Sequence, residues 1–349
     1  MKTKVLIVDD SALMRQILTA ILARDTSLEV VGVASDPYMA REKIMRLSPD
    51  VITLDVEMPR MDGLTFLEKL MRAHPLPVVM VSSLTERGCE TTWRALELGA
   101  TDFVTKPKLD VQTGTMQLAQ EIIDKVKAAA SAKVRIARRV PPLRPEPKRT
   151  PLPVAMAYRA THKVVAIGAS TGGTEAIREV LTRLPADSPG IVMVQHMPEK
   201  FTTSFADRLN SLSKVNVSEA RDGDRVLPGH ALLAPGNFHM EVARSGAEYR
   251  VRVFSADPVN RHRPSVDVLF ASCARQLGAN AVGVILTGMG GDGAREMAAM
   301  RRAGAHTIAQ DEESCVVFGM PKEAIAMGGA AEILPLDRIS AGILRAVAA

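Results

Sequence analysis

The sequence has few cysteines, no long hydrophobic run and no leader-like start. Its three cysteines, Cys89, Cys273 and Cys315, are far apart and form no C-x-x-C pair, which predicts neither a disulfide framework nor a zinc site. No apolar stretch approaches the roughly 20 residues of a membrane span. The first apolar run reaches Asp9 too early for a secretory signal. These absences predict a reduced, cytoplasmic protein without direct membrane insertion.

Excess charge is also missing outside one segment. The chain of 349 residues carries a net charge of +5, yet seven bases and one acid between Lys133 and Arg149 give that segment +6. The remainder, at −1, is nearly neutral, so no folded domain requires a nucleic-acid partner. Prolines from Pro141 to Pro153 favour an extended connector over a helix. We predict a basic, proline-rich linker over 126–160, which serves as a solvated tether or as a contact surface.

The first 125 residues repeat one pattern five times. A short apolar run ends in a polar residue, and a segment with helical spacing of apolar residues follows. The apolar runs are Leu6–Val8, Val30–Val33, Val51–Leu54, Val78–Val81 and Asp102–Val104. Five strand–helix units predict a parallel, doubly wound sheet with helices on both faces.

Polar residues stand where these predicted strands end. They are Asp9, Asp10, Asp55, Ser82 and Lys106. The carboxyl ends of parallel strands form the edge at which open α/β sheets bind ligands. Three carboxylates there repel one another unless a cation joins them, and hard oxygen ligands suit Mg²⁺. The alternative is a set of ordinary solvated acids in loops, which explains one such residue more easily than five.

The motifs around these residues resemble the receiver domain of two-component response regulators. They are Val8-Asp9-Asp10-Ser11, Leu54-Asp55-Val-Glu-Met-Pro59 with Asp62-Gly63, Val81-Ser82-Ser83 and Thr105-Lys106-Pro107. The resemblance implies a flavodoxin-like fold with strand order 2-1-3-4-5. It also implies that Asp55 is the phosphoacceptor, and that Asp10, Asp55 and the Glu57 carbonyl bind Mg²⁺ with Asp9 acting through water. Phosphoryl contacts are implied for Ser82 and Lys106, and a switch role for Phe103.

The second half, 161–349, begins with a stretch that has two interpretations. The apolar run Val164–Ile167 leads into Gly168-Ala-Ser-Thr-Gly-Gly173 and then a helical segment. This matches the G-x-S-x-G elbow, in which a serine nucleophile stands on a strand–turn–helix junction. The plainer interpretation is that Ser170 or Thr171 caps the helix.

Two further polar residues follow strands of this half. His196 follows Ile191–Gln195, and Asp292 lies in the glycine-rich loop after Ala281–Leu286. A hydroxyl needs an imidazole to take its proton and a carboxylate to orient that imidazole, so the three form a candidate triad. Other bases and orienting acids remain open at this point, namely His239, His262, His306, Asp222, Asp224, Asp257 and Asp311. Between 215 and 254, alternating stretches predict antiparallel β structure inserted in or appended to the main sheet.

The combined motifs of this half resemble the chemotaxis protein-glutamate methylesterases of the CheB family. They are Gly168–Gly173, Gln195-His-Met-Pro198, Ala234-Pro-Gly236, Pro264-Ser-Val-Asp267, Leu286–Gly293 and Gly319-Met-Pro321. The resemblance implies a Rossmann-like domain with Ser170 as nucleophile, His196 as base and acid, and Asp292 as its orienting partner. The Met289 amide is the implied oxyanion donor, and the esterase reaction is expected to need no cofactor.

The implied function is phosphorylation-controlled hydrolysis of glutamate methyl esters on methyl-accepting chemoreceptors, with deamidation of glutamine by the same chemistry. A histidine kinase is the implied phosphodonor. Two other classes are disfavoured by the residues. A DNA-binding output needs a basic recognition helix, and a nucleotide site needs G-x-G-x-x-G or a P-loop lysine, which the 287–293 loop lacks.

Overall fold

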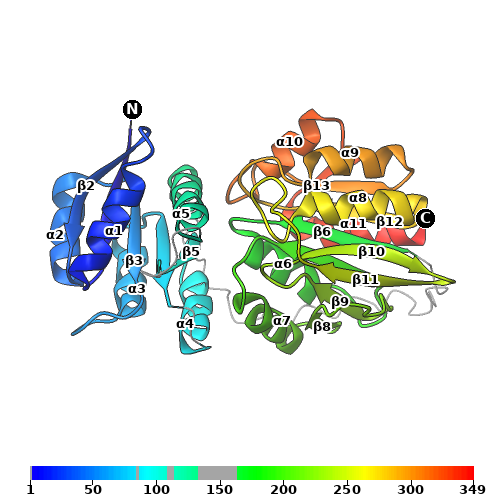
Figure 1. Ribbon diagram of the computed structural model, residues 1–349, viewed down its shortest axis with the longest axis horizontal. Coiled ribbons are helices and arrows are strands. Elements are labelled where there is room, and N and C mark those ends of the chain that lie inside the picture. The colour runs from blue at the N-terminus through cyan, green and yellow to red at the C-terminus, as the bar shows by residue number, and fades with distance from the viewer. Residues whose placement is uncertain (1, 84–85, 108–113, 133–162) are drawn as a thin grey trace, which may run out of the picture.

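The computed structural model describes residues 2–83, 86–107, 114–132 and 163–349. Two α/β units lie side by side, and each is built around its own parallel sheet (Figure 1). The predicted linker lies mostly outside the described residues. Helix α5 runs on to Ser131, beyond residue 125, and Val126 and Ala129 are buried within it.

The first unit has the strand order β2-β1-β3-β4-β5, as expected, and all its pairs are parallel. Its elements are β1 (Thr3–Val8), α1 (Ala12–Leu22), β2 (Leu28–Ala34), α2 (Pro37–Leu47), β3 (Val51–Asp55), α3 (Gly63–Ala73), β4 (Val78–Ser82), α4 (Glu86–Glu97), β5 (Asp102–Thr105) and α5 (Gly114–Ser131).

Both faces of this sheet are buried, which explains why its strands are continuous apolar runs. Val5 and Ile7 of β1 face α1 and α5, whereas Leu6 and Val8 belong to the cluster under α2, α3 and α4. Helix α1 begins where the Ser11 hydroxyl accepts a hydrogen bond from the Met14 amide. That cap ends the strand–loop segment that carries the acidic residues.

The second unit has a seven-stranded sheet in the order β14-β13-β12-β6-β7-β9-β8. Its elements are β6 (Val164–Ala169), α6 (Gly173–Thr182), β7 (Gly190–Gln195), α7 (Phe201–Leu212), β8 (Asn216–Glu219), β9 (His230–Leu233), β10 (His239–Ser245), β11 (Glu248–Phe254), α8 (Val266–Gln276), a 3-10 turn (Gly278–Asn280), β12 (Ala281–Ile285), α9 (Ala294–Arg302), β13 (His306–Gln310), α10 (Met320–Ala326), β14 (Glu332–Leu334) and α11 (Leu336–Ala348). Helices α6, α7 and α11 share one hydrophobic cluster, and α8, α9 and α10 share the other.

The expectation for residues 215–254 is correct in part and wrong in part. β10 and β11 form an antiparallel hairpin that packs on α8, as an appended β element should. The stretch around Ala231–Leu233 is instead a parallel strand of the main sheet, paired with both β7 and β8. The alternation that suggested an antiparallel partner identified a strand but not its direction, because direction depends on which strand it pairs with.

The two units meet through an aromatic cluster. Trp93 of α4 stacks on Phe205 of α7 with ring centroids 5.0 Å apart, and Phe103 of β5 contacts Phe201 at 4.5 Å. The indole N–H of Trp93 donates to the Ser204 hydroxyl at 2.8 Å. All four aromatic side chains are almost fully buried, so one hydrophobic cluster continues from one sheet to the other.

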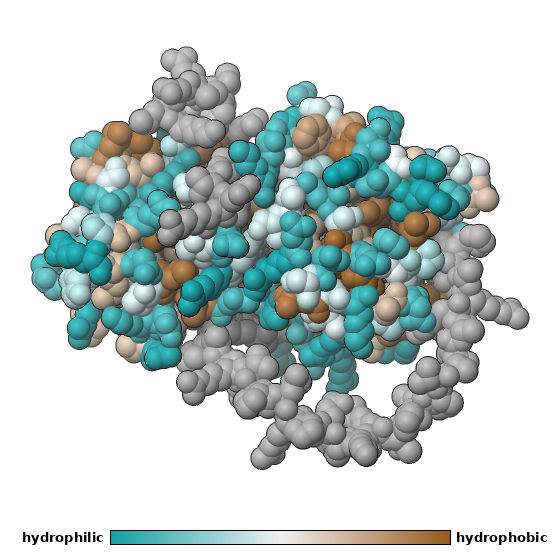
Figure 2. Space-filling model, turned by 90° about the horizontal axis from the view of Figure 1, so that it is seen from below, coloured by the Kyte–Doolittle hydropathy of each residue, from teal (hydrophilic) through white to brown (hydrophobic). Residues whose placement is uncertain are grey.

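The face shown in Figure 2 is mainly hydrophilic in its described part. On the face shown in Figure 2, hydrophobic residues of the described part form small separate groups. Among the described residues, no helix has the length and hydrophobicity to cross a membrane.

Candidate active site

Three neighbouring strands bring Ser170, His196 and Asp292 to one edge of the second sheet. β6 lies between β12 and β7, and the residue after β6 is Ser170 while the residue after β7 is His196. The His196 amide donates to the Ala169 carbonyl at 3.1 Å, and the Ser170 amide donates to the Thr287 carbonyl at 3.0 Å. Backbone hydrogen bonds thus continue the sheet past the strand ends at Ser170 and His196, and Asp292 follows in the loop after β12.

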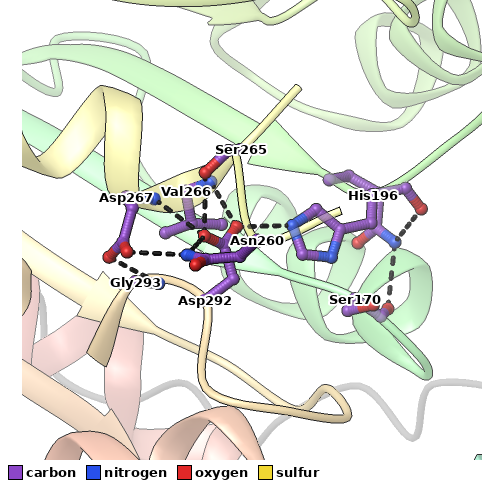
Figure 3. A network of polar contacts seen from close by, with 9 residues as sticks. Ser170, His196, Asn260, Ser265, Val266, Asp267, Asp292 and Gly293 are labelled. Carbon is purple, nitrogen blue, oxygen red and sulfur yellow. Dashed lines mark hydrogen bonds and ion pairs between the residues drawn. The ribbon is translucent and has the colours of Figure 1, made fainter. Parts of the chain in front are cut away.

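His196 and Asp292 are directly hydrogen-bonded. Imidazole Nε2 lies 2.8 Å from Asp292 Oδ2, and both side chains are buried. Four further donors surround the carboxylate, as Figure 3 shows: Asn260 Nδ2 at 2.8 Å, the Ser265 hydroxyl at 2.8 Å, and the amides of Val266 at 2.6 Å and Asp267 at 3.3 Å. These bonds fix the carboxylate and keep it as an acceptor.

The electrostatics follow from this donor set. Burial by itself raises the pKa of Asp292, but the hydrogen bond and charge of His196, and then the bonds from Asn260 and Ser265, hold the pKa below its usual range. Because an ionised carboxylate only accepts, His196 Nε2 carries the hydrogen and Nδ1 is the basic nitrogen of the neutral ring. Nδ1 is buried and has no hydrogen-bond partner among the described residues.

Ser170 lies on the other side of this imidazole, on the turn between β6 and α6 (Figure 3). Its carbonyl accepts from Gln195 Nε2 at 2.9 Å and from the Gly173 amide at 2.7 Å. None of the hydrogen bonds among the described residues joins its hydroxyl to His196. The loop after β12 closes on it, because a Cβ added to Gly288 would lie 2.8 Å from the Ser170 Cβ.

The helix-cap interpretation of this turn is wrong. The N-cap of α6 is Gly172, with φ +77°, and no side chain caps the helix. Only glycine adopts this left-handed conformation readily, and a Cβ there would also meet Val316. The Thr171 hydroxyl instead donates to Asp102 Oδ2 of the first unit at 2.6 Å.

The rival residues form no comparable pair. His306 lies against Glu332 at 3.4 Å on another part of the sheet, and His239 bonds the Asp257 carbonyl. His262 stacks on the His196 ring, with centroids 3.7 Å apart. The carboxylates of Asp222, Asp224 and Asp311 accept from nearby backbone amides or a hydroxyl.

Met289 lies in the loop that approaches Ser170. Its amide donates no hydrogen bond to the described residues, whereas the neighbouring Gly288 amide and carbonyl are paired with Val317, Gly319 and Met320. The residue just before this amide is thus held by three backbone hydrogen bonds, and a restrained amide without a partner among the described residues suits an oxyanion donor.

The predicted acidic residues of the first sheet also converge. One oxygen from each of Asp9, Asp10 and Asp55 lies within 4.8 Å of the others. Asp9 Oδ2 is buried without a hydrogen bond, and its nearest cation is Lys106 at 3.8 Å. The Glu57 amide donates to Asp55 Oδ1 at 3.3 Å, so the backbone at Glu57 lies next to the cluster. These hard oxygen donors fit a small divalent cation such as Mg²⁺.

Lys106 and Ser82 lie where the sequence placed them, at the ends of β5 and β4. Lys106 Nζ is 2.8 Å from Asp55 Oδ2, and Ser82 is buried at the end of β4. Burial raises the pKa of Asp55 to about 6, against the opposing hydrogen bond from Lys106, and the Asp9 charge adds to the rise. When ionised, the three carboxylates of Asp9, Asp10 and Asp55 outnumber the single charge of Lys106, so negative charge is in excess at this edge. Phe103 points instead into the aromatic cluster between the units.

Sequence reasoning missed the roles of several residues of these sites. Asn260 precedes α8 and has no helical or strand spacing that marks it, and His262 was considered only as an alternative base. Gly63 appears in the Asp62-Gly63 motif, but its close approach is not visible there: a Cβ at Gly63 would lie 2.1 Å from the Asp55 carbonyl oxygen. The motif Pro264-Ser-Val-Asp267 was a usable signal for Ser265, since Ser265, Val266 and Asp267 all donate to Asp292.

Fold and sites together define a class of protein, a response regulator whose receiver domain is joined to a hydrolytic domain built on a parallel, Rossmann-like sheet. Comparisons with known proteins agree. Residues 5–115 match the family model described as the response regulator receiver domain, and residues 165–343 match the one described as CheB methylesterase. The chain belongs to the CheB methylesterase family.

Relatives match over nearly the whole chain. A Geobacter metallireducens protein named protein-glutamate methylesterase/protein-glutamine glutaminase 1 is 61% identical over 340 residues, covering 96% of this chain and 93% of that protein. A Salmonella typhimurium protein of the same name, without the number, is 58% identical over 349 residues, covering 100% and 98%. The crystal structure of the Thermotoga maritima CheB methylesterase catalytic domain is 40% identical, with a TM-score of 0.51, and covers 52% of this chain and 97% of that one.

Proposed function

We propose that this protein hydrolyses glutamate methyl esters on methyl-accepting chemoreceptors, and converts receptor glutamine to glutamate by the same chemistry. The observation that carries the proposal is the buried His196–Asp292 hydrogen bond at the sheet edge where Ser170 stands. The names of the relatives supply the substrate class. In this proposal Ser170 is the nucleophile, His196 the base and Asp292 the orienting acid.

In the proposed mechanism His196 Nδ1 takes the proton of the Ser170 hydroxyl as Oγ attacks the ester carbonyl. Asp292 stabilises the imidazolium through Nε2, and the Met289 amide donates to the oxyanion. His196 then protonates the departing methoxide, and methanol leaves. Water, deprotonated by His196, attacks the glutamyl-enzyme and releases the receptor carboxylate and the serine. With glutamine the leaving group is ammonia.

We propose three segments: a receiver domain at 1–125, a linker at 126–160 and a catalytic domain at 161–349. The receiver domain is proposed to control the catalytic domain. Asp55 is the proposed phosphoacceptor. Asp10, Asp55 and the Glu57 carbonyl are the proposed Mg²⁺ ligands, with Asp9 acting through water. Bound Mg²⁺ would neutralise charge on the phosphoryl oxygens, and Ser82 and Lys106 would contact those oxygens. A histidine kinase is the proposed phosphodonor, the protein is proposed to act in the cytoplasm, and no nucleic-acid partner is proposed.

Inhibition by the unphosphorylated receiver is supported by contacts at the active site itself. Asp102 holds Thr171, the residue next to the nucleophile, and Arg261 pairs with Asp124 of α5 at 3.7 Å. Arg208 of α7 pairs with Glu97 of α4. A switch acts only through contacts that differ between its states, and these contacts exist only while the domains are docked. Phosphorylation is proposed to loosen them, with Phe103 as the switch aromatic.

The test is methanol release from membranes that contain methyl-esterified chemoreceptors, with a phosphodonor and Mg²⁺. Ser170→Ala should lower kcat by at least about 10³-fold. Ser245→Ala, in the exposed end of β10, is the matched control and should leave the rate unchanged. A fluorophosphonate should label the wild-type protein at Ser170. Near-normal methanol release by Ser170→Ala would refute the assignment.

A further inference from the structure

A tight turn before α8 contacts both His196 and Asp292 of the proposed triad. Val259 and His262 exchange two backbone hydrogen bonds, of 3.1 and 2.9 Å, across Asn260 and Arg261. Both central residues have positive φ, +51° and +69°. This is the pattern of a type I′ turn, which favours glycine and asparagine and is costly for arginine. Such a conformation persists when surrounding contacts hold it in place.

Each residue of this turn has a different contact. Asn260 Nδ2 donates to Asp292 Oδ1 at 2.8 Å and to Asp267 Oδ2 at 2.7 Å. The His262 ring lies on the His196 ring, with centroids 3.7 Å apart and planes 12° from parallel. Arg261 is exposed, and its one ion pair among the described residues is with Asp124 of the receiver.

The stacking contact matters because only one ring nitrogen of His196 is hydrogen-bonded. Its Nε2 is bonded to Asp292, and this bond alone does not fix the plane of the ring. Its Nδ1 has no hydrogen-bond partner among the described residues. The His262 ring, packed on one face, opposes rotation of the His196 ring out of its plane.

We propose that His262 is a positioning residue for catalysis, which holds the His196 imidazole in its productive plane by stacking as an uncharged ring. This inference rests on the proposed function. His262 needs no ring nitrogen for the task, and it donates no hydrogen bond to Asp292 or to Ser170 among the described contacts. The role is distinct from that of the general base, because no carboxylate orients His262.

The charges around His262 are compatible with an uncharged ring. The groups that face it are His196 after β7, Asp292 before α9, Lys125 on α5 and Arg261 in its own turn. Burial lowers the pKa of His262 to about 3, and the positive charge of a protonated His196 adds to this effect while Asp292 opposes it. When His196 becomes an imidazolium during the reaction, its neighbour is thus a neutral π-system and not a second cation.

The experiment compares two substitutions in the full chain at saturating phosphodonor and Mg²⁺. Under these conditions docking of the receiver on the catalytic domain does not limit the rate. Rates are expressed per Ser170 site titrated by a fluorophosphonate, which removes any loss through misfolding. His262→Ala should lower kcat at least tenfold with little change in KM, since a small displacement of the base acts on the chemical step. His262→Phe keeps a flat, uncharged ring and should stay within about threefold of wild type. Ser245→Ala, at the exposed end of β10, is the control and should not change kcat.

Two results would overturn the inference. The first is an unchanged kcat per titrated site in His262→Ala. The second is a His262→Phe variant as slow as His262→Ala, which would mean that a ring nitrogen of His262 takes part in proton transfer. Failure of the proposed function is separate from both, because it would appear as activity in Ser170→Ala and as no titratable Ser170.

Discussion

Trp93 is the residue whose truncation should release the catalytic domain most directly. It is the only tryptophan of the chain, is 5% exposed, and contacts Phe103 on its own side and Phe201 and Phe205 across the interface. Its indole N–H also bonds Ser204. Trp93→Ala removes the stacking and leaves that hydroxyl without its donor. We expect a higher rate of methanol release in the absence of any phosphodonor.

The size of the effect follows from the contacts. Truncating a buried aromatic at the centre of an interface typically costs about 2 to 4 kcal/mol of docking free energy. Since about 1.4 kcal/mol is tenfold, the ratio of docked to undocked protein should fall by about 30-fold to about 900-fold. The basal rate should rise until undocking is complete, and a phosphodonor should then add little. Trp93→Phe keeps a ring but loses the N–H, so its basal rate should be intermediate.

The assay needs two controls. Adding Asp55→Asn to Trp93→Ala should leave the high basal rate unchanged, because release no longer depends on phosphorylation. Leu18→Ala weakens the receiver on the face of α1, in a cluster that contains receiver residues only. Its basal rate should stay low. If Leu18→Ala activates as strongly as Trp93→Ala, or if Trp93→Ala leaves the basal rate unchanged, the aromatic interface does not inhibit the enzyme.

Three further predictions concern the two sites. Asp292→Asn should lower kcat by about 10³- to 10⁴-fold, measured as methanol release per folded molecule, because a neutral amide does not stabilise the His196 imidazolium. In wild type, chelation of Mg²⁺ by EDTA should abolish the response to a phosphodonor, and Asp55→Asn should do the same. His262→Phe should resist acid better than wild type. A histidine whose pKa falls from 6.5 to about 3 on folding contributes stability that is complete above pH 6.5 and is lost as the pH falls toward 3. The variant has no such group to protonate. Relative to wild type, its free energy of unfolding should therefore be higher at pH 4 than at pH 7, by up to about 3 kcal/mol. Thermal unfolding at the two pH values measures this difference.

The sheets and the strand-end residues were predictable because burial on two faces leaves a clear pattern. Each parallel strand is an apolar run, and the polar residue that ends it marks the functional edge. This is why Asp55, Ser170 and His196 were found with their neighbours. The direction of β9 was not predictable in the same way, because alternation within one strand says nothing about the partner beside it.

The supporting residues were less predictable because their roles arise from contacts between distant segments. Asn260 and Asp292 are 32 positions apart and meet only when α8 packs beside α9. Thr171 and Asp102 are 69 positions apart and belong to different domains. Threonine is one of the residues preferred at a helix N-cap, because its hydroxyl can accept from a free backbone amide, so the local sequence favours that role for Thr171. The glycine at the actual cap position frees the threonine side chain for the receiver.

The short strand β5 shows how one element can belong to both sites. It begins at Asp102, whose carboxylate accepts from Thr171 beside the nucleophile, and Lys106, which pairs with Asp55, follows its last residue. Lys125 donates to the Phe103 carbonyl and pairs with Asp102, so the strand is also held from α5. At about 3.3 Å per residue, the two ends are only about 13 Å apart. The proposed phosphorylation of Asp55 would change the group that Lys106 contacts at one end of β5, and the hydrogen bond to Thr171 beside the nucleophile lies at the other end. The domain contacts that respond to phosphorylation should therefore be sought first along β5 and the aromatic side chain that it carries.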